Sequence, residues 1–202
     1  MKRSILFLTI MVTCLGSLIA QTGQDWKWLH PTPQGNRLNW VKAWSVTDWY
    51  AVGTAGTFMK TTDAGATWTF NHKAGRPFAT SGQTSNANDA HFFDMQNGIV
   101  VGSSSGIMKT TDGGNTWADV AGNPLAASVT LNQIFFLNNN VGYIAGSSGN
   151  LLKTTDGGNN WTLVPVGVTT TLYDIWTTDD QTILVPTTGG NIRRSTDGGA
   201  TW

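Results

Sequence analysis

Four aspartates stand in nearly identical ten-residue segments, and a carboxylate repeated in this way could act as an acid, a base or a metal ligand. The segments read MKTTDAGATW (59–68), MKTTDGGNTW (108–117), LKTTDGGNNW (152–161) and RRSTDGGATW (193–202). Most glycoside hydrolases need two carboxyl groups that flank the scissile bond. The chain has no glutamate, so all 12 acidic residues are aspartates and any such pair would consist of two of them.

A basic residue stands three positions before the aspartate of every segment, namely Lys60, Lys109, Lys153 and Arg194. Four cations at one place of a repeat could together contact a partner. They could also pair with carboxylates of neighbouring units or stay solvated. In the fourth segment Arg193 replaces the apolar residue found before each lysine, so the pair Arg193–Arg194 is the better contact candidate.

Other chemistry-bearing residues lie outside the four segments. Asp174 falls in a segment that could line a central channel, and it is the best single catalytic candidate; a solvated or backbone-bonded aspartate is the alternative. His91 could act as a ligand together with Asp89, but no second histidine or cysteine stands nearby, so we expect no metal site. Arg76 lies in the long polar connection 72–89, a kind of loop that often carries function on a rigid scaffold.

The elements that position these residues follow from the repeat itself. The tryptophans that end the segments, Trp68, Trp117, Trp161 and Trp202, are 49, 44 and 41 residues apart. A period of 40 to 50 residues with strand-like content is typical of propeller blades and not of helical solenoids. Ten tryptophans and 24 glycines also favour an all-β chain with tight turns.

The third unit shows the internal plan of a blade. Its apolar runs 131–137, 141–147, 151–155 and 161–166 are separated by turns rich in asparagine, glycine and aspartate. Four short antiparallel strands joined by such turns make one blade. The sequence predicts an all-β propeller of such blades, at about 37–71, 86–122, 130–166 and 171–202.

Each residue of the repeated segment has a structural task in this plan. Asp112 begins a tight turn and can accept hydrogen bonds from the amides just ahead, while Thr110 places a hydroxyl beside it. Gly114 can adopt a positive φ, and Trp117 can bury its ring against a neighbouring blade. The equivalent residues are Thr61, Asp63, Gly65 and Trp68; Thr154, Asp156, Gly158 and Trp161; and Ser195, Asp197, Gly199 and Trp202.

The N-terminus reads as a secretory signal peptide over residues 1–20, with Lys2 and Arg3 before an apolar run. The single cysteine, Cys14, lies within it, so no disulfide is expected. Removing Lys2 and Arg3 from the 12 basic residues leaves ten against 12 acidic ones, which provides no basic field for nucleic acid. We therefore expect a secreted, periplasmic or cell-surface protein without an integral membrane segment after cleavage.

The two ends of the repeat region differ from its middle. Residues 21–36 contain DWKWLHPTP, which resembles a lone fourth strand followed by a linker. The fourth unit stops at Trp202, on the first residues of its last strand. We therefore expect the blades at 37–202 to be incomplete at the C-terminus and to belong to a larger propeller.

The pattern [S/T]-x-D-x-G-x-x-W resembles the Asp-box, or BNR repeat. The wider unit AVGTAGTFMKTTDAGATW resembles the photosystem II stability/assembly factor family and its non-photosynthetic bacterial relatives, over roughly residues 26–202. Photosynthetic members are seven-bladed lumenal proteins that help to assemble photosystem II. The resemblance implies a thylakoid lumen location only in a photosynthetic source, and this chain is poor in the arginines that would make a family-like basic patch.

Two classes of function remain open at this point. Sialidases also carry Asp-boxes, but their mechanism needs a glutamate and an arginine cluster, which this chain lacks. The favoured hypothesis is a secreted, non-catalytic propeller without cofactor or metal that binds a protein partner or acts in assembly. The alternatives are the N-terminal part of a secreted Asp-box glycoside hydrolase and a propeller that binds an extracellular glycan in adhesion.

Overall fold

The computed structural model describes residues 35–77, 84–126 and 128–202, all within one compact unit, Gln34–Trp202. The predicted signal peptide and nearly all of the predicted N-terminal strand and linker lie outside the described residues. So does the centre of the connection 72–89. Among the described residues, no helix is long and apolar enough to cross a membrane.

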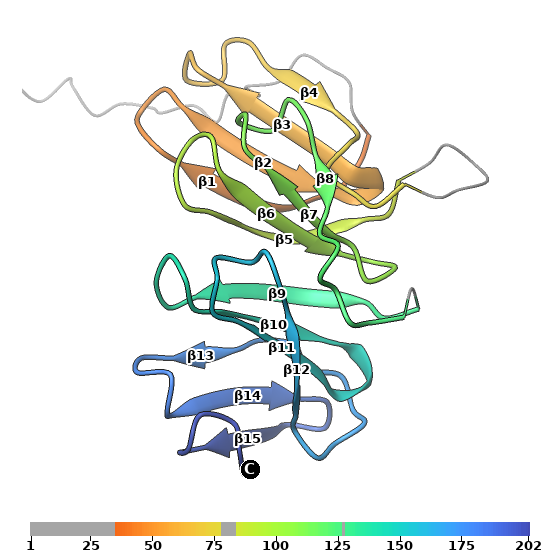
Figure 1. Cartoon of the computed structure of the whole chain (residues 1–202). Helices are drawn as coiled ribbons and strands as arrows, with labels where there is room; N and C mark the ends of the chain where they lie inside the picture. Colours follow the sequence, from red (N-terminus) through yellow and green to blue (C-terminus); the bar gives the residue numbers. More distant parts are fainter. Residues whose placement is uncertain (1–34, 78–83, 127) are drawn as a thin grey trace, which may run out of the picture. The chain divides into compact units, whose positions relative to one another are not determined.

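The unit consists of four antiparallel sheets, which we call blades 1 to 4 (Figure 1). Blade 1 contains β1 (Leu38–Ala43), β2 (Trp49–Gly53), β3 (Thr57–Thr61) and β4 (Thr69–Asn71). Blade 2 contains β5 (Ala87–Phe92), β6 (Gly98–Gly102), β7 (Ile107–Thr110) and β8 (Ala118–Asp119). Blade 3 contains β9 (Leu131–Phe136), β10 (Gly142–Gly146), β11 (Asn150–Thr154) and β12 (Thr162–Pro165). Blade 4 contains β13 (Trp176–Thr177), β14 (Ile183–Thr187) and β15 (Asn191–Ser195).

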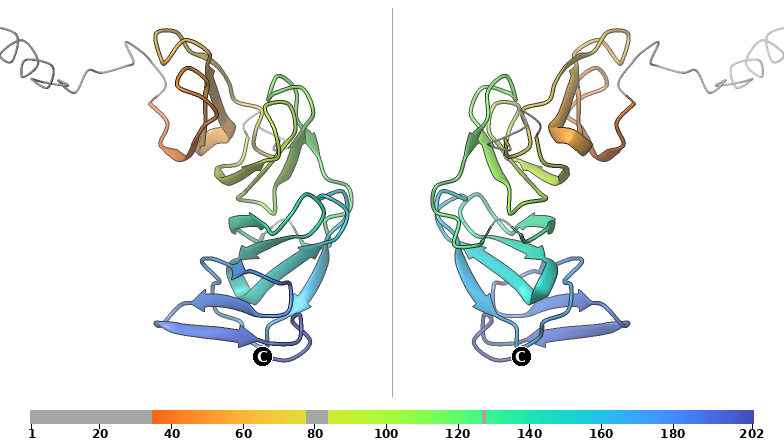
Figure 2. Two further views of the ribbon diagram at one scale, coloured as in Figure 1. Left: turned by 90° about the vertical axis from the view of Figure 1, so that its left-hand side faces the viewer. Right: turned by 90° about the vertical axis from the view of Figure 1, so that its right-hand side faces the viewer.

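In each blade the strands pair in sequence order, so every strand is joined to the next by a short connection (Figure 2). Two of these connections are single 3-10 turns, η1 (Thr54–Gly56) and η2 (Ser147–Gly149). Sequential antiparallel pairing of four short strands is the blade arrangement of a β-propeller. The predicted fold class is therefore confirmed.

The second strand of a blade is its most buried one. β6 (GIVVG) and β10 (GYIAG) are buried along their whole length, and β2 is buried except at its first residue. Side chains of a strand point alternately to the two faces of its sheet. Burial on both faces means that β6 and β10 lie between two neighbouring layers, which explains their near-continuous apolar sequences.

Blade 4 departs from the predicted strand pattern because its first strand is short. The sequence predicts a strand over 171–178, but the ladder to β14 covers only Trp176 and Thr177. Pro186 of β14 has no N–H group and cannot donate to the residues before Trp176. Before Trp176 the two segments are joined by the Tyr173 amide donating to the Pro186 carbonyl at 3.1 Å, the Thr188 amide donating to the Thr171 carbonyl at 3.0 Å, and a bridge between Leu172 and Thr187.

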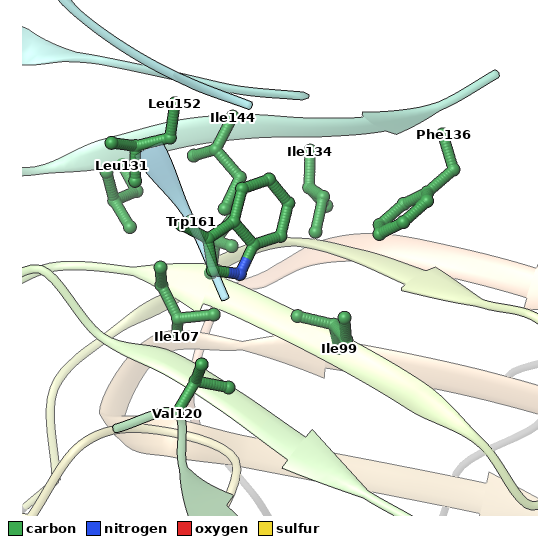
Figure 3. Packing of buried hydrophobic residues seen from close by; sticks show 10 residues of the cluster. Ile99, Ile107, Val120, Leu131, Ile134, Phe136, Ile144, Leu152 and Trp161 are labelled. Atoms are coloured by element: carbon green, nitrogen blue, oxygen red, sulfur yellow. The ribbon is translucent and has the colours of Figure 1, made fainter. Parts of the chain in front are cut away.

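The hydrophobic core consists of clusters that lie between consecutive blades. The cluster shared by blades 2 and 3 contains Ile99 and Ile107 on one side and Leu131, Ile134 and Leu152 on the other (Figure 3). Blades 1 and 2 share a second cluster that is rich in aromatic rings, and blades 3 and 4 share a third. Each blade is therefore stabilised by its neighbours as well as by its own ladder.

Candidate functional site

The repeated turn closes through its hydroxyl and its carboxylate in all four blades. In blade 2 the Thr110 hydroxyl donates to Asp112 Oδ1 at 2.9 Å and accepts the Gly114 N–H at 2.9 Å. The Asp112 carboxylate also accepts the Thr116 N–H at 2.9 Å and the Thr116 hydroxyl at 2.6 Å. Both carboxylate oxygens are thus occupied within the turn. The equivalent bonds are present around Asp63, Asp156 and Asp197.

These hydrogen bonds hold the pKa of each motif aspartate at about 2. The largest cause is the side chain four residues ahead, which is Thr116 for Asp112 and Asn160 for Asp156. Hydrogen bonds to the charged form favour that form. A carboxyl group that stays ionised well below neutral pH is a poor general acid, so the turn geometry suits a structural joint.

The tryptophans at the ends of the second, third and fourth motifs pack toward the preceding blade. The Trp117 ring lies 5.5 Å from Phe58 of blade 1, and its Nε1 donates to the Gly114 carbonyl at 3.1 Å. Trp161 lies in the cluster between blades 2 and 3 (Figure 3). Trp68 has no described blade before it and instead lies 6.3 Å from Trp49 of its own blade.

Three of the four repeated cations form hydrogen bonds or an ion pair with the next blade. Lys60 donates to the Gly113 carbonyl at 3.1 Å and to Asn115 Oδ1 at 3.0 Å, both in the turn of blade 2. In the same way Lys109 donates to Asn159 Oδ1 of blade 3 at 2.6 Å. A partner-binding role for these lysines remains a prediction, and any such partner would meet cations already engaged within the chain.

The third lysine uses a carboxylate because the turn of blade 4 has an alanine, Ala200, in place of the asparagine. Lys153 Nζ forms an ion pair with Asp180 Oδ2 at 2.9 Å, and the Tyr143 hydroxyl donates to the same carboxylate. Arg193 donates to the Val166 carbonyl at 3.2 Å. Arg194 is exposed and has no partner among the described residues.

Arg76 is also engaged inside the chain. Its Nε pairs with Asp119 Oδ2 at 2.8 Å, and its Nη1 donates to the Ser104 carbonyl at 3.1 Å. Arg76 therefore ties the connection after blade 1 to blade 2. A partner-binding role for Arg76 stays a prediction, and it would have to compete with this pair.

The first strands of the blades carry a row of polar side chains that sequence reasoning noticed only in part. Asp89 Oδ2 accepts the Ile134 N–H of the next blade at 2.8 Å, and Gln133 Oε1 accepts the Ile175 N–H at 3.0 Å. Asp174 occupies the same position in blade 4, where it is exposed and accepts its own neighbour's N–H at 2.8 Å. This row therefore joins consecutive first strands.

Asparagines make a second row beside the first. The Nδ2 groups of Asn39, Asn88 and Asn132 donate to carbonyls of Ala87, Leu131 and Leu172 in the next blade, at 2.7 Å each. Sequence reasoning missed these residues. Their signal was an asparagine in second place of the first strand in three units.

Burial shifts the ionisation of two groups on β5 in opposite senses. Burial raises the pKa of Asp89 to about 6, with a contribution from the charge of Asp174. Burial, together with the charge of Lys42, lowers the pKa of His91 to about 4. The His91 ring lies 4.9 Å from Phe93 and 4.8 Å from Phe136, so it is neutral and packed between rings at neutral pH.

The asparagine row borders an open pocket of about 350 Å³, which we call the amide pocket. Its lining residues are Arg37, Asn39, Thr54, Asn86, Asn88 and Asn132. A lining that combines an arginine with asparagines and a threonine can offer hydrogen-bond donors to the carbonyls or a carboxylate of a peptide. In the parts of the chain that the structure describes, no three potential metal ligands come together.

Solved structures share this fold. "YCF48 bound to D1 peptide" is 18% identical with a TM-score of 0.51, over 84% of this chain and 82% of that one. An ancestral GH74 enzyme is 18% identical with a TM-score of 0.64, and the GH74 xyloglucanase from Xanthomonas campestris is 18% identical with a TM-score of 0.57. These two matches cover 89% and 77% of this chain but only 25% and 27% of the enzymes.

At these identities the solved structures establish the fold alone. No curated protein matches the chain. The family model described as "Photosynthesis system II assembly factor YCF48" matches residues 77–202, which is more than half of the sequence. The chain therefore belongs to the family of photosystem II assembly factor YCF48, a family of BNR-repeat β-propellers.

Proposed function

We propose that this protein is a secreted, non-catalytic propeller that binds a segment of another protein and acts as an assembly scaffold. The observation that carries the proposal is the amide pocket, where Arg37 lies among amide side chains at the edge of three linked first strands. The YCF48 of the same fold has been solved with a D1 peptide. An extended peptide offers the carbonyls, amides and carboxylate that such a lining can bind.

A titration with fluorescently labelled D1 peptide tests this function. We expect saturable binding, weaker by about 10- to 150-fold in Arg37→Gln because a charge-assisted hydrogen bond contributes about 1.5–3 kcal/mol. Lys73→Gln removes an exposed cation outside the pocket and serves as the matched control. Equal affinity of both variants would place the peptide elsewhere, and a scrambled peptide that binds equally well would refute specific recognition.

The photosynthetic role and the location have their own tests. A photosystem II role requires a source with photosystem II genes and recovery of a photosystem II subunit with the tagged protein. A source without these genes would refute that role and leave a bacterial assembly or binding function. Sequencing of the exported protein should find Gln21 as its first residue if the signal peptide is cleaved as proposed.

One observation favours a glycoside hydrolase as second candidate. Asp89 has a raised pKa, to which the charge of Asp174 contributes, and a carboxyl group with a raised pKa can act as a general acid. Against this, the Asp89 carboxylate already accepts the Ile134 N–H. Hydrolysis of xyloglucan or an aryl glycoside that is lost in Asp174→Asn would establish the enzyme and refute the non-catalytic proposal.

A further inference from the structure

An open groove lies between blades 2 and 3, beside β8, the fourth strand of blade 2, and we call it the Lys109 groove. Its volume is about 340 Å³, and its lining includes Lys109, Thr111, Thr116, Ala118, Val120 and Asn159. This volume falls at the lower end of the range of small-molecule sites, about 300–1,000 Å³. The groove shares no residue with the amide pocket, and both of its walls belong to blades that have a described blade on either side.

The Lys109 groove is wider than the equivalent groove between blades 1 and 2, which has a volume of about 140 Å³. In that narrower groove Asn71 Nδ2 donates to the Gly114 carbonyl of blade 2 at 2.8 Å, so its side chain spans the space between the blades. Val120 has the position of Asn71 in blade 2 and cannot make such a bond. Ala118 likewise replaces the larger Thr69. The additional space between blades 2 and 3 therefore follows from two residues of the fourth strand.

The polar groups of the groove still have hydrogen-bonding capacity for a ligand. Lys109 Nζ donates to Asn159 Oδ1 at 2.6 Å and to a carbonyl of the same turn at 3.4 Å, which leaves one of its three N–H groups. The Thr111 hydroxyl is exposed and makes no hydrogen bond with a described residue. The Thr116 hydroxyl donates to Asp112 Oδ2 at 2.6 Å and can still accept. The groove can therefore both donate hydrogen bonds to a ligand and accept them from it.

The charges around the groove do not favour an anionic ligand. Asp112 stands three residues after Lys109, and Asp156 accepts the backbone N–H of the asparagine that Lys109 contacts, at 3.0 Å. Both carboxylates stay ionised, with a pKa of about 2. Asp119, also in the lining, pairs with Arg76 at 2.8 Å. These three carboxylates outnumber the two cations, so an acidic ligand would gain no net attraction.

Apolar side chains complete the lining of the groove. Ala118 is exposed there, and Val120 belongs to the hydrophobic cluster between blades 2 and 3 (Figure 3). Ligand sites in proteins combine apolar surface with a few placed polar groups. The ring of a neutral sugar has C–H groups on its faces and hydroxyls around its edge, and each hydroxyl can donate and accept. This chemistry matches the mixed, uncharged demand of the groove.

We propose that the Lys109 groove binds one ring of a neutral glycan. A sugar hydroxyl accepts the remaining N–H of Lys109, a second one bonds the Thr111 hydroxyl, and a third donates to Thr116. The C–H groups of the ring pack on Ala118. Because the groove is open to solvent, the sugars on either side of this ring extend away from the protein. The site is distinct from the amide pocket and does not depend on the peptide binding proposed there.

Two-dimensional amide NMR of the isotope-labelled chain tests this site, with cellotriose, mannotriose and galactotriose as neutral probes and trigalacturonate as the acidic one. We expect at least one neutral trisaccharide to shift the amide signals of Thr111, Ala118 and Asn159 in a saturable way at millimolar concentration. Trigalacturonate should bind more weakly. Absence of these shifts with all three neutral probes, or tighter binding of trigalacturonate, would overturn the proposal.

Two pairs of variants locate the ligand within the groove. Thr111→Val should weaken binding by about 2- to 12-fold, the effect of one neutral hydrogen bond, whereas Thr155→Val, at the same motif position of blade 3 and outside the groove, should not. Ala118→Phe should fill the groove and remove binding, whereas Thr69→Phe, the same change at the equivalent place in blade 1, should keep it.

Thermal melts check that each variant is folded, which is expected because all four positions are exposed. Titration with the D1 peptide should give the same affinity for all four variants, so loss of glycan binding and loss of peptide binding can be told apart. Unchanged glycan affinity in both Thr111→Val and Ala118→Phe would place the sugar elsewhere and refute the assignment of this groove.

Discussion

Replacing Gly114 by alanine tests whether the repeated turn is fitted against the neighbouring blade. Gly114 has a φ of +79°, and a Cβ atom there would lie 2.2 Å from Cε1 of Phe58. The Phe58 ring is 1% exposed and packs against Tyr50 and Trp117, so it has no free space to move into. Two costs therefore combine at this position, one from the backbone conformation and one from the clash between blades.

A second glycine separates the two costs. Gly190, in the turn between β14 and β15, has a φ of +76°, and nothing lies within 4 Å of the position that a Cβ atom would take there. An alanine in the left-handed region costs about 1–2 kcal/mol. Forcing a methyl group into a packed core costs about 1–3 kcal/mol more. We expect Gly190→Ala to lose about 1–2 kcal/mol of unfolding free energy and Gly114→Ala about 2–5 kcal/mol.

Urea unfolding followed by tryptophan fluorescence, together with calorimetry, measures this difference. For a unit of this size each kcal/mol corresponds to about 2–4 °C in Tm, so Gly114→Ala should melt at least about 2 °C below Gly190→Ala. Coincident transitions by both probes would support two-state unfolding. Equal losses in the two variants would refute the argument that Phe58 fills the space beside the turn.

Three further predictions concern titration and packing. Asp89 has a folded pKa of about 6 against 3.8 in the reference state, so its stabilisation is present below pH 4 and is lost as pH rises through 6. Asp89→Asn keeps an acceptor for the Ile134 N–H, so at pH 8 it should raise the free energy of unfolding by about 3 kcal/mol and raise Tm, whereas near pH 4 it should leave Tm unchanged. The four motif aspartates have folded pKa values of about 2, so their contribution to stability is present above pH 4 and is lost as pH falls toward 2. Tm should therefore drop when it is measured at decreasing pH from 5 to 2.5. A constant Tm would contradict the turn geometry. In denaturant unfolding, Trp161→Ala should lower the free energy of unfolding by about 3–5 kcal/mol, because the Trp161 ring is buried between blades. Trp68→Ala should lower it clearly less, because Trp68 packs on Trp49 of its own blade. Equal losses in the two variants would contradict this account.

Much of the fold could be predicted because the repeated sequence pattern indicates the strands and turns of each blade locally. The spacing of the motif tryptophans indicated the blade period, and the glycine and asparagine turns separated the strands. The ladder of blade 4 could not be derived this way, since the effect of Pro186 depends on which residue of the first strand it opposes. Register is a long-range property, and the sequence of 171–178 alone reads as an ordinary strand.

The partners of the repeated cations were beyond sequence reasoning for a similar reason. Lys60 and Asn115 are 55 residues apart in the chain but 3.0 Å apart in space, and only the order of the blades brings them together. Once the order of the blades is known, the different partner of Lys153 at the interface between blades 3 and 4 can also be explained. Ala200 replaces the asparagine there, and Asp180 supplies the acceptor for Lys153.

Aspartates of this scaffold thus have pKa values shifted in opposite directions, and the surroundings of each carboxyl group, not its place in the repeated motif, determine the direction. The motif aspartates, Asp112 among them, lie at the surface with both oxygens hydrogen-bonded, which holds their pKa near 2. Asp89 lies outside the four repeated ten-residue segments, yet its burial beside the first strand of blade 3 raises its pKa to about 6. Asp174, the candidate catalyst from sequence, has the same blade position but no following strand among the described residues. Its hydrogen bond is to the N–H of its own neighbour, Ile175, so hydrolysis measured on Asp174→Asn would decide whether this carboxylate is a local structural group or a reactive one.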